Sequence, residues 1–181
     1  MRLLLQVALV VVWISSASYA QNQRAPYAGQ EKREIKALSP DDIQAYENGV
    51  GMGLAKAAEL NQYPGPKHVL ELSAELKLSE RQKAEIQKIY DRMHAQATRL
   101  GASLIAKERE LDQLFASKRI DREKLRRVVA EIARLQGELR VTHLQAHLDV
   151  RALLLPNQIK QYDTLRGYAT AGADKEHQHK H

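Results

Sequence analysis

The sequence contains no cysteine among its 181 residues. Disulfide bonds, thiolate metal sites and cysteine nucleophiles are therefore excluded. Aromatic residues make up only 5% of the chain, so the stacking surfaces that single-stranded nucleic acids require are scarce. The net charge of +6 arises from 28 basic and 22 acidic residues that are mixed along the chain, a pattern typical of a solvated surface. These features argue against nucleic acid as a partner.

Motifs that build catalytic centres are also missing. The glycines of Gly49–Gly53 follow no strand pattern and lack the lysine of a phosphate-binding loop. No serine lies in a nucleophile elbow, and the adjacent acids Asp41 and Asp42 occupy the start of an expected helix. We therefore expect a protein that acts by binding and is not an enzyme. The sequence leaves open whether the three glycines allow close helix packing or form a hinge.

A long apolar run occurs only near the N-terminus. Arg2 precedes an apolar stretch over 3–14, and small residues follow up to Ala20. This order predicts a secretory signal peptide over residues 1–20, cleaved after Ala20. An uncleaved anchor is the alternative, although the run is shorter than the roughly 20 residues of a membrane span. The only tryptophan, Trp13, lies in this segment.

The rest of the chain divides by composition into three parts. Residues 21–38 are polar and without periodicity, which favours a disordered arm. Residues 39–170 carry helical patterns and form the expected domain. Residues 171–181 form a second disordered tail that contains His177, His179 and His181.

Short helices are expected in the first part of the domain. Ser39 followed by Pro40 and two acids predicts a helix start, and we expect this helix to continue towards Leu60. Tyr63-Pro64-Gly65-Pro66 breaks the helical pattern. A further short helix is expected over residues 67–76.

Two long amphipathic helices are expected over residues 79–115 and 121–153. Apolar residues recur three and four positions apart in both, and the short connection between them requires an antiparallel hairpin. Aligning the apolar stripes places Leu104 beside Leu135 and Met93 beside Ala146. A final helix begins at Pro156 and ends near Gly167. The expected fold is all-α, a long antiparallel helical hairpin with shorter flanking helices, hooked or cradle-like, and thin enough that a coiled-coil homodimer would cover its apolar stripe.

The starts of two helices carry a shared motif. Leu78-Ser79-Glu80-Arg81-Gln82 resembles the L-T-x-x-Q motif of the Spy/CpxP family of periplasmic proteins, whose relatives include the zinc-resistance-associated protein and heavy-metal sensors. A second copy, Leu154-Leu155-Pro156-Asn157-Gln158, keeps Leu154 and Gln158 but has Leu155 at the hydroxyl position. The resemblance implies a periplasmic, all-α homodimer that takes part in envelope stress, either as a chaperone or as a protein that binds transition metals. Physically, each motif is a helix cap.

Three histidines form the candidate metal site. His143 and His147 are four residues apart on one helix and share a face, a spacing at which two imidazoles can bind one ion. The expected hairpin register brings His94 within a turn of both. Such ligands suit zinc, nickel, cobalt or copper(II), with no cofactor strictly required. The tail histidines could bind metal more weakly. Ordinary half-buried histidines are the alternative interpretation.

Two functions follow from these features. The first is a periplasmic heavy-metal resistance or sensor protein, which could act on a membrane-bound regulatory partner. The alternative is an ATP-independent chaperone that cradles unfolded client proteins on an amphipathic helical dimer.

Overall fold

The computed structural model describes residues 25–168. The chain divides into two units, residues 1–31 and 32–181. In the first, residues 25–31 form turns in which the Gly29 amide donates to the Glu31 carboxylate at 2.6 Å. A short 3-10 helix, η1 (Gln30–Lys32), follows. All helices discussed below belong to the second unit.

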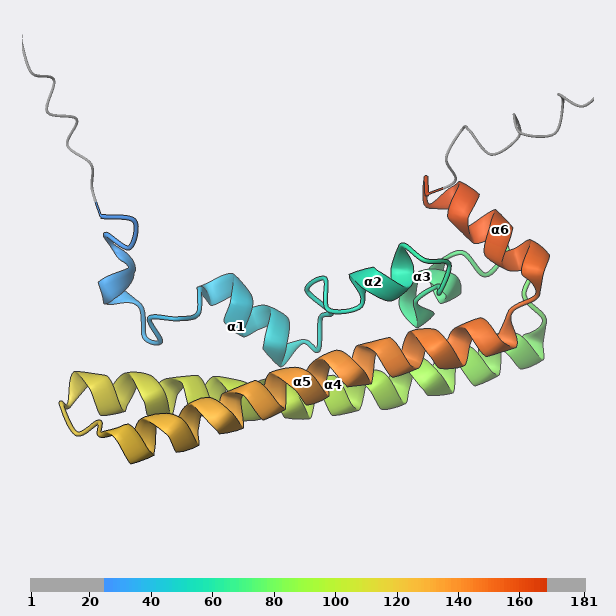
Figure 1. The fold of residues 1–181 in the computed structure, drawn as a ribbon. Helices are drawn as coiled ribbons and strands as arrows, with labels where there is room; N and C mark the ends of the chain where they lie inside the picture. Colours follow the sequence, from blue (N-terminus) through green and yellow to red (C-terminus); the bar gives the residue numbers. More distant parts are fainter. Residues whose placement is uncertain (1–24, 169–181) are drawn as a thin grey trace, which may run out of the picture. The chain divides into compact units, whose positions relative to one another are not determined.

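Six α-helices, and no strand, occur in the part of the chain that the structure describes. They are α1 (Pro40–Glu47), α2 (Lys56–Glu59), α3 (Pro66–Glu71), α4 (Glu80–Ala116), α5 (Arg122–Leu153) and α6 (Pro156–Leu165). Figure 1 shows α4 and α5 lying side by side over their whole length, joined by a short turn. The predicted all-α fold and its long hairpin are confirmed. Within residues 25–168, no helix has the length and apolarity needed to cross a bilayer.

Side-chain caps set the beginnings of the long helices. The Ser79 hydroxyl accepts from the Gln82 amide, and the Gln82 side chain accepts from the Ser79 amide, which completes a capping box at the start of α4. At the start of α5, the Asp121 carboxylate accepts from the Lys124 amide at 2.8 Å. Both helices therefore begin where the sequence predicts.

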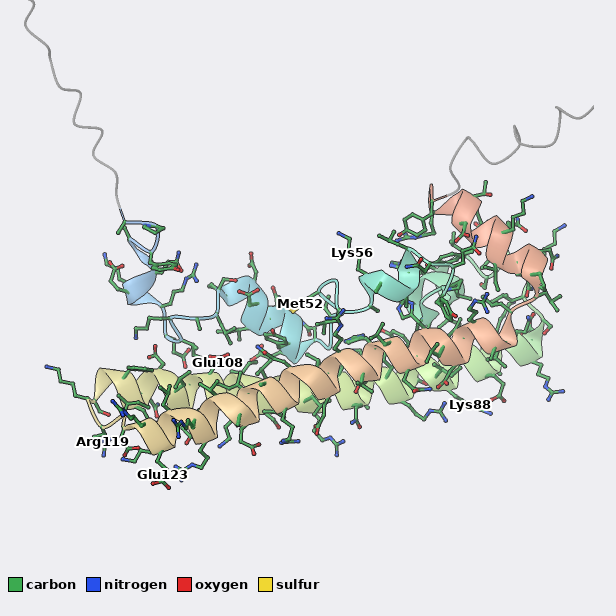
Figure 2. The ribbon with its side chains drawn as sticks, in the orientation of Figure 1. Met52, Lys56, Lys88, Glu108, Arg119 and Glu123 are labelled. Carbon is green, nitrogen blue, oxygen red and sulfur yellow. The ribbon has the colours of Figure 1, made fainter. Side chains whose placement is uncertain are left out.

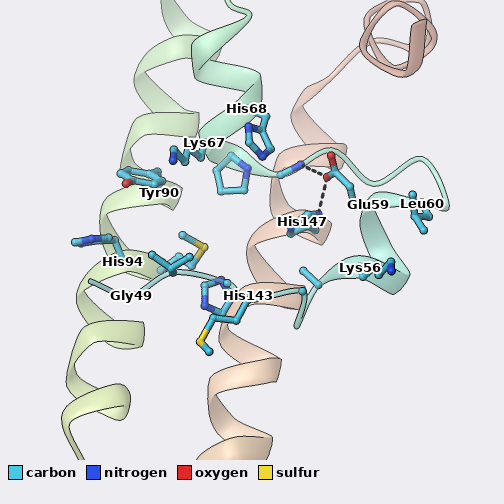
Figure 3. Close-up of a pocket in the computed structure, with 18 of the residues that line it drawn as sticks. Gly49, Lys56, Glu59, Leu60, Lys67, His68, Tyr90, His94, His143 and His147 are labelled. Atoms are coloured by element: carbon cyan, nitrogen blue, oxygen red, sulfur yellow. Dashed lines mark hydrogen bonds and ion pairs between the residues drawn. The ribbon is translucent and has the colours of Figure 1, made fainter. Parts of the chain in front are cut away.

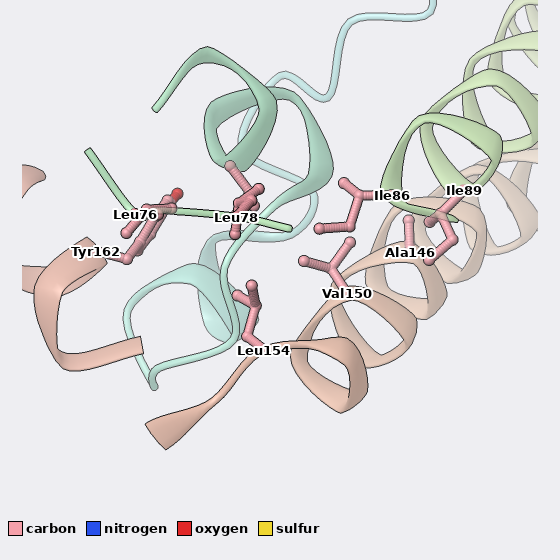
Figure 4. Close-up of a cluster of buried hydrophobic side chains, with 9 residues drawn as sticks. Leu76, Leu78, Ile86, Ile89, Ala146, Val150, Leu154 and Tyr162 are labelled. Atoms are coloured by element: carbon pink, nitrogen blue, oxygen red, sulfur yellow. The ribbon is translucent and has the colours of Figure 1, made fainter. Parts of the chain in front are cut away.

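The hairpin contains two separate apolar cores. The first, which we call the tip cluster, lies towards the α4–α5 turn and consists of Ala97, Leu100, Leu104, Val128, Ile132, Leu135 and Leu139. The second, the open-end cluster, lies where α4 begins and α5 ends, and also includes residues of α3 and α6 (Figure 4): Val69, Leu76, Leu78, Ile86, Ile89, Ala146, Val150, Leu154 and Tyr162. Leu104 and Leu135 share one cluster, and Met93 packs on the cluster that contains Ala146, as the predicted register requires.

The two motif glutamines meet at the open end. Gln82 Nε2 donates to Gln158 Oε1 at 2.9 Å and to the Leu153 carbonyl at 2.9 Å. Gln158 Nε2 donates to the Leu76 carbonyl at 3.1 Å, and its Oε1 accepts from the Leu155 amide at 2.9 Å. Gln158 thus supplies the glutamine half of a capping box at the start of α6, while its own backbone amide donates to the Leu155 carbonyl at 3.0 Å, since Leu155 has no hydroxyl to accept it. The two motif copies are physically joined.

The prediction of one helix from Ser39 towards Leu60 is wrong. Helix α1 ends at Glu47, and α2 begins only at Lys56. The backbone between them takes positive φ at Gly49 (59°), Met52 (44°) and Gly53 (79°), a conformation that interrupts a helix and that glycine adopts most readily.

Gly101, by contrast, serves close helix packing. A Cβ atom added there would lie 2.3 Å from the Tyr46 carbonyl oxygen, so α1 rests directly on the α4 backbone. The glycine in α4 is the site where another helix approaches.

Residues 33–38, which composition assigns to a disordered arm, pack on α4. Ile35 is fully buried and Leu38 nearly so, in a small cluster with Ile105. Arg109 pairs with Glu34 at 2.9 Å and Lys36 with Asp112 at 3.1 Å. Two isolated apolar residues in a polar segment give no periodic signal, which is why composition alone does not identify this packing.

The outer sides of the long helices are highly charged. Figure 2 shows Lys88 on α4 and Glu123 on α5 directed away from the hairpin. Arg134 pairs with Glu131 at 3.0 Å and with Glu138 at 2.6 Å. Such exposed pairs contribute little to stability, because solvent and salt screen their charges.

Candidate functional site

A pocket of about 710 Å³ lies between the α1–α2–α3 segment and the open half of the hairpin. Its walls include the glycine-rich loop, α2, α3, and side chains of α4 and α5. Among the lining residues are Gly51, Met52, Met93, His94, His143 and His147. All three helix histidines named from the sequence therefore border one cavity (Figure 3).

The glycine-rich loop closes the pocket over His143. A Cβ added at Gly51 would lie 3.4 Å from His143 Nδ1, so the loop backbone packs directly against the imidazole. A side chain on Gly49 would approach the His94 carbonyl at 3.2 Å, and this residue has a φ of +59°. The loop lies close to both long helices because these positions carry no side chain.

His143 is buried, with 4% of its surface exposed. Its Nε2 atom is inaccessible and has no hydrogen-bond partner among the described residues. Burial lowers the pKa of His143, and the nearby His147 lowers it further. The ring is therefore held neutral, with one nitrogen unused. An unsatisfied buried polar atom is costly, by about 1–3 kcal/mol, and requires an explanation.

His147 is one turn further along α5 and is also buried. Its Nδ1 lies 2.6 Å from the Tyr63 carbonyl oxygen. A carbonyl can only accept, so Nδ1 carries a proton, and in the neutral form of the ring Nε2 carries the lone pair. This hydrogen bond fixes the ring orientation in the way that outer-shell partners orient metal-binding histidines.

Glu59 connects this pocket to α6, and its side chain is only 13% exposed. One carboxylate oxygen accepts from the Tyr162 hydroxyl at 2.5 Å, and the other accepts from the Gly65 amide at 3.2 Å. Arg166 Nε and His147 Nδ1 each lie 3.7 Å from the carboxylate. Burial and the Glu59 contact together raise the pKa of Tyr162 well above its ordinary value.

His94 does not join the other two imidazoles. Figure 3 shows its ring on the outer side of α4, pointing away from His143 and His147, and it stacks on Tyr90 with ring centroids 5.6 Å apart. Within residues 25–168, no three His, Asp or Glu side chains are grouped as a metal site of protein ligands alone would require. Metal binding by the three histidines remains a prediction.

Two carboxylates close in sequence to these histidines have separate surroundings. Asp91 and Asp149 each accept from a glutamine one turn away, at 2.8 and 3.0 Å. The tail histidines and Ala20 lie outside the described residues. Glu59 was not identified from the sequence, because it lies in a four-residue helix that carries no periodic pattern.

The comparison with protein families matches residues 48–161 to the heavy-metal resistance family. This chain belongs to that family. The family includes the Spy/CpxP-like periplasmic helical proteins, so the resemblance seen in the two glutamine motifs is confirmed. No curated protein and no solved structure gives a significant match.

The heavy-metal resistance family implies a metal ion, and the pocket fits one in part. The unpartnered Nε2 of His143 and the oriented ring of His147 are two suitable nitrogen donors. Thioethers of Met52 and Met93 also line the pocket. Further ligand positions would have to be supplied by water or by these sulfur atoms, since the described carboxylates are engaged elsewhere.

Proposed function

We propose that this chain is a periplasmic metal-responsive protein that binds one divalent transition metal ion through His143 and His147. The observation that carries the proposal is the buried, unpartnered Nε2 of His143 beside a second imidazole of fixed tautomer. Membership of the heavy-metal resistance family supports it. The role would be a metal buffer or the sensing component of a regulatory system.

The residues of the pocket have distinct roles in this proposal. His143 and His147 would hold the ion, because both present imidazole nitrogens on one face of α5. The ion would supply positive charge within a half-closed pocket, where it competes with protons for the imidazoles. The Tyr63 carbonyl would maintain the His147 tautomer. Glu59 lies near His147 and accepts a hydrogen bond from Tyr162 of α6. Its contacts with these two residues would change when the metal ion binds.

Calorimetric titration with zinc and with nickel tests the proposal. The wild-type chain is expected to bind one equivalent and to melt at a higher temperature with metal, because a ligand specific for the folded state stabilises it. His143→Ala and His147→Ala are each expected to weaken binding at least tenfold, roughly the loss that accompanies disruption of a metal site's supporting contacts. Equal affinity in wild type and both variants would refute the proposal.

His94→Ala is the matched comparison. Its ring points away from the other two imidazoles, so we expect metal affinity to change less than about threefold, within the usual scatter for surface substitutions. A loss as large as that of His143→Ala would show instead that His94 turns inward as a third ligand.

A chaperone function is the second candidate, favoured by an exposed apolar stripe on the outer side of α5. Val141 is 62% exposed and Leu148 50% exposed, with Leu144 between them. Contiguous exposed apolar surface can hold unfolded chains. Suppression of aggregation of an unfolded client without metal, abolished by Val141→Ser/Leu148→Ser, would support this function.

A further inference from the structure

The tip of the hairpin carries most of the net charge of the protein. Residues 117–127 contain six basic side chains and two acidic ones, which gives 6 − 2 = +4 against +6 for the whole chain. Figure 2 shows Arg119 and Glu123 at this end of the hairpin. The tip is therefore a concentrated cationic surface.

Most of these cations have no internal partner. Among the described ion pairs, only Lys124 is neutralised at the tip, by Asp121 at 2.7 Å. The described residues offer no carboxylate partner to Lys118, Arg119, Arg122, Arg126 or Arg127. Arg122 and Arg126 also stand four residues apart on α5, where like charges destabilise a helix slightly. Nothing in the fold itself explains this concentration of charge.

Exposed apolar side chains lie among the cations. Phe115, the only phenylalanine of the chain, is 54% exposed at the end of α4, and Leu125 and Val129 are 38% and 44% exposed on α5. Leu125 and Val129 form a row along the helix, and Arg122 and Arg126 form the neighbouring row, each arginine three residues before an apolar residue. Cationic and apolar side chains thus lie next to each other on the exposed surface of α5, whereas an ordinary amphipathic helix directs its apolar side chains into the core.

We propose that the hairpin tip docks on a membrane surface of anionic phospholipid headgroups. Adjacent rows of arginine and aliphatic side chains match the boundary between headgroups and acyl chains, where cations meet phosphates and apolar groups enter the outer acyl region. An acidic polypeptide without apolar side chains would use the cations but would leave Phe115, Leu125 and Val129 without a role. The lipid assignment accounts for both sets.

Co-sedimentation with lipid vesicles tests the proposal, using the chain without residues 1–20 and with no metal added. We expect binding to phosphatidylglycerol-containing vesicles, none to pure phosphatidylcholine vesicles, and release at high salt, because surface charge is screened. Each cation near such a surface contributes about fivefold in affinity. Arg119→Gln/Arg122→Gln/Arg126→Gln is therefore expected to weaken binding roughly hundredfold.

A control variant removes the same charge elsewhere. Arg81→Gln/Arg92→Gln/Arg99→Gln lies on exposed positions of α4 away from the tip, and should reduce binding by less than about fivefold, the contribution expected of a single surface cation. A second comparison tests the apolar side chains. Leu125→Ser/Val129→Ser is expected to weaken vesicle binding about tenfold, because apolar burial is lost. Val141→Ser/Leu148→Ser, away from the tip, is expected to leave vesicle binding unchanged.

Three results would overturn the proposal. The first is absence of binding to the anionic vesicles. The second is equal loss in the tip and α4 charge variants, which would indicate diffuse attraction. The third is a pair of observations: the tip cations are needed to bind a polyglutamate peptide, and Leu125→Ser/Val129→Ser does not change vesicle binding. Together these would assign the tip to an acidic protein partner. His143→Ala should retain vesicle binding, so this test is independent of the metal proposal.

Discussion

The tip cluster of the α4–α5 hairpin consists of aliphatic side chains, whereas the open end also buries two imidazoles of α5 and, on α6, the Gln158 amide and the Asp163 carboxyl group. Leu104 and Leu135 belong to the tip cluster. At the open end, His143 and His147 on α5 and the motif residue Gln158 on α6 are all less than 10% exposed.

This difference separates an apolar part of the hairpin, which stabilises the fold, from the polar part in which we propose the metal site. Burial of apolar area is non-directional and tolerates change in detail. Buried polar groups require specific partners, and each missing partner is costly. His143 Nε2 is one of three buried side-chain atoms without a hydrogen-bond partner among the described residues, with Thr98 Oγ1 and Arg166 Nε. We propose a metal ion as the partner of His143, because this chain belongs to the heavy-metal resistance family.

The largest loss of stability is expected from a substitution in the tip cluster. Leu104→Ala removes a side chain that is 1% exposed and should lower the free energy of unfolding by about 2–5 kcal/mol. Urea denaturation would measure this loss. Val141→Ala, at an exposed position, should change stability by less than about 0.5 kcal/mol. A small loss in Leu104→Ala would contradict the placement of the tip cluster.

In the polar half, Gln158→Leu should cost about 2–3 kcal/mol, because the Leu76 carbonyl, the Leu155 amide and the Gln82 amide lose buried partners. Replacing Gln82 and Gln158 together removes both the donor and the acceptor of their mutual hydrogen bond. The double variant should therefore lose less stability than the sum of the losses in the two single variants. A double-mutant cycle by urea denaturation measures the coupling. Strict additivity would show that the two glutamines act separately.

Two glycines in the long helices should respond with opposite signs. Gly101→Ala places a methyl group against the Tyr46 carbonyl and should lower stability by about 1–3 kcal/mol through overpacking. Gly137→Ala meets open space and should raise stability by about 0.5–1 kcal/mol through helix propensity. Thermal denaturation of both variants would check the contrast. Stabilisation in both would mean that α1 does not rest on α4.

The smallest expected effect is a pH dependence from His143. Its folded-state pKa lies below the ordinary value of 6.5, so the unfolded chain binds the proton more readily. Stability should therefore fall as pH drops below about 6.5 and level off below the folded-state pKa. In His143→Leu, the melting temperature should change less between about pH 8 and pH 5. Equal pH profiles would contradict the burial of this imidazole.

The sequence predicts the hairpin well because its signals are local and repeated. Spacings of three and four along α4 and α5, and the caps Ser79 and Asp121, specify both helices and their register. The short helices are harder, since three glycines can either pack or break a helix, and only the positive φ at Gly49 and Gly53 decides this.

The candidate site is predictable only along one helix. His143 and His147 share a face of α5 whatever else the chain does, and both are found in the pocket. The direction of the His94 ring depends on how α4 is rotated and on its stacking with Tyr90, which register alone does not determine. Glu59 reaches the site through tertiary contacts between α2 and distant residues, so no local pattern reveals it.

Nitrogen-15 NMR of the imidazoles during titration with zinc tests the central claim most directly. In the metal-free protein, His147 should show the Nδ1-protonated tautomer set by the Tyr63 carbonyl. With one equivalent of zinc, the Nε2 signals of His143 and His147 should shift together, while those of His94 stay in place. Unchanged His143 and His147 signals, alongside shifts confined to other histidines, would contradict the account.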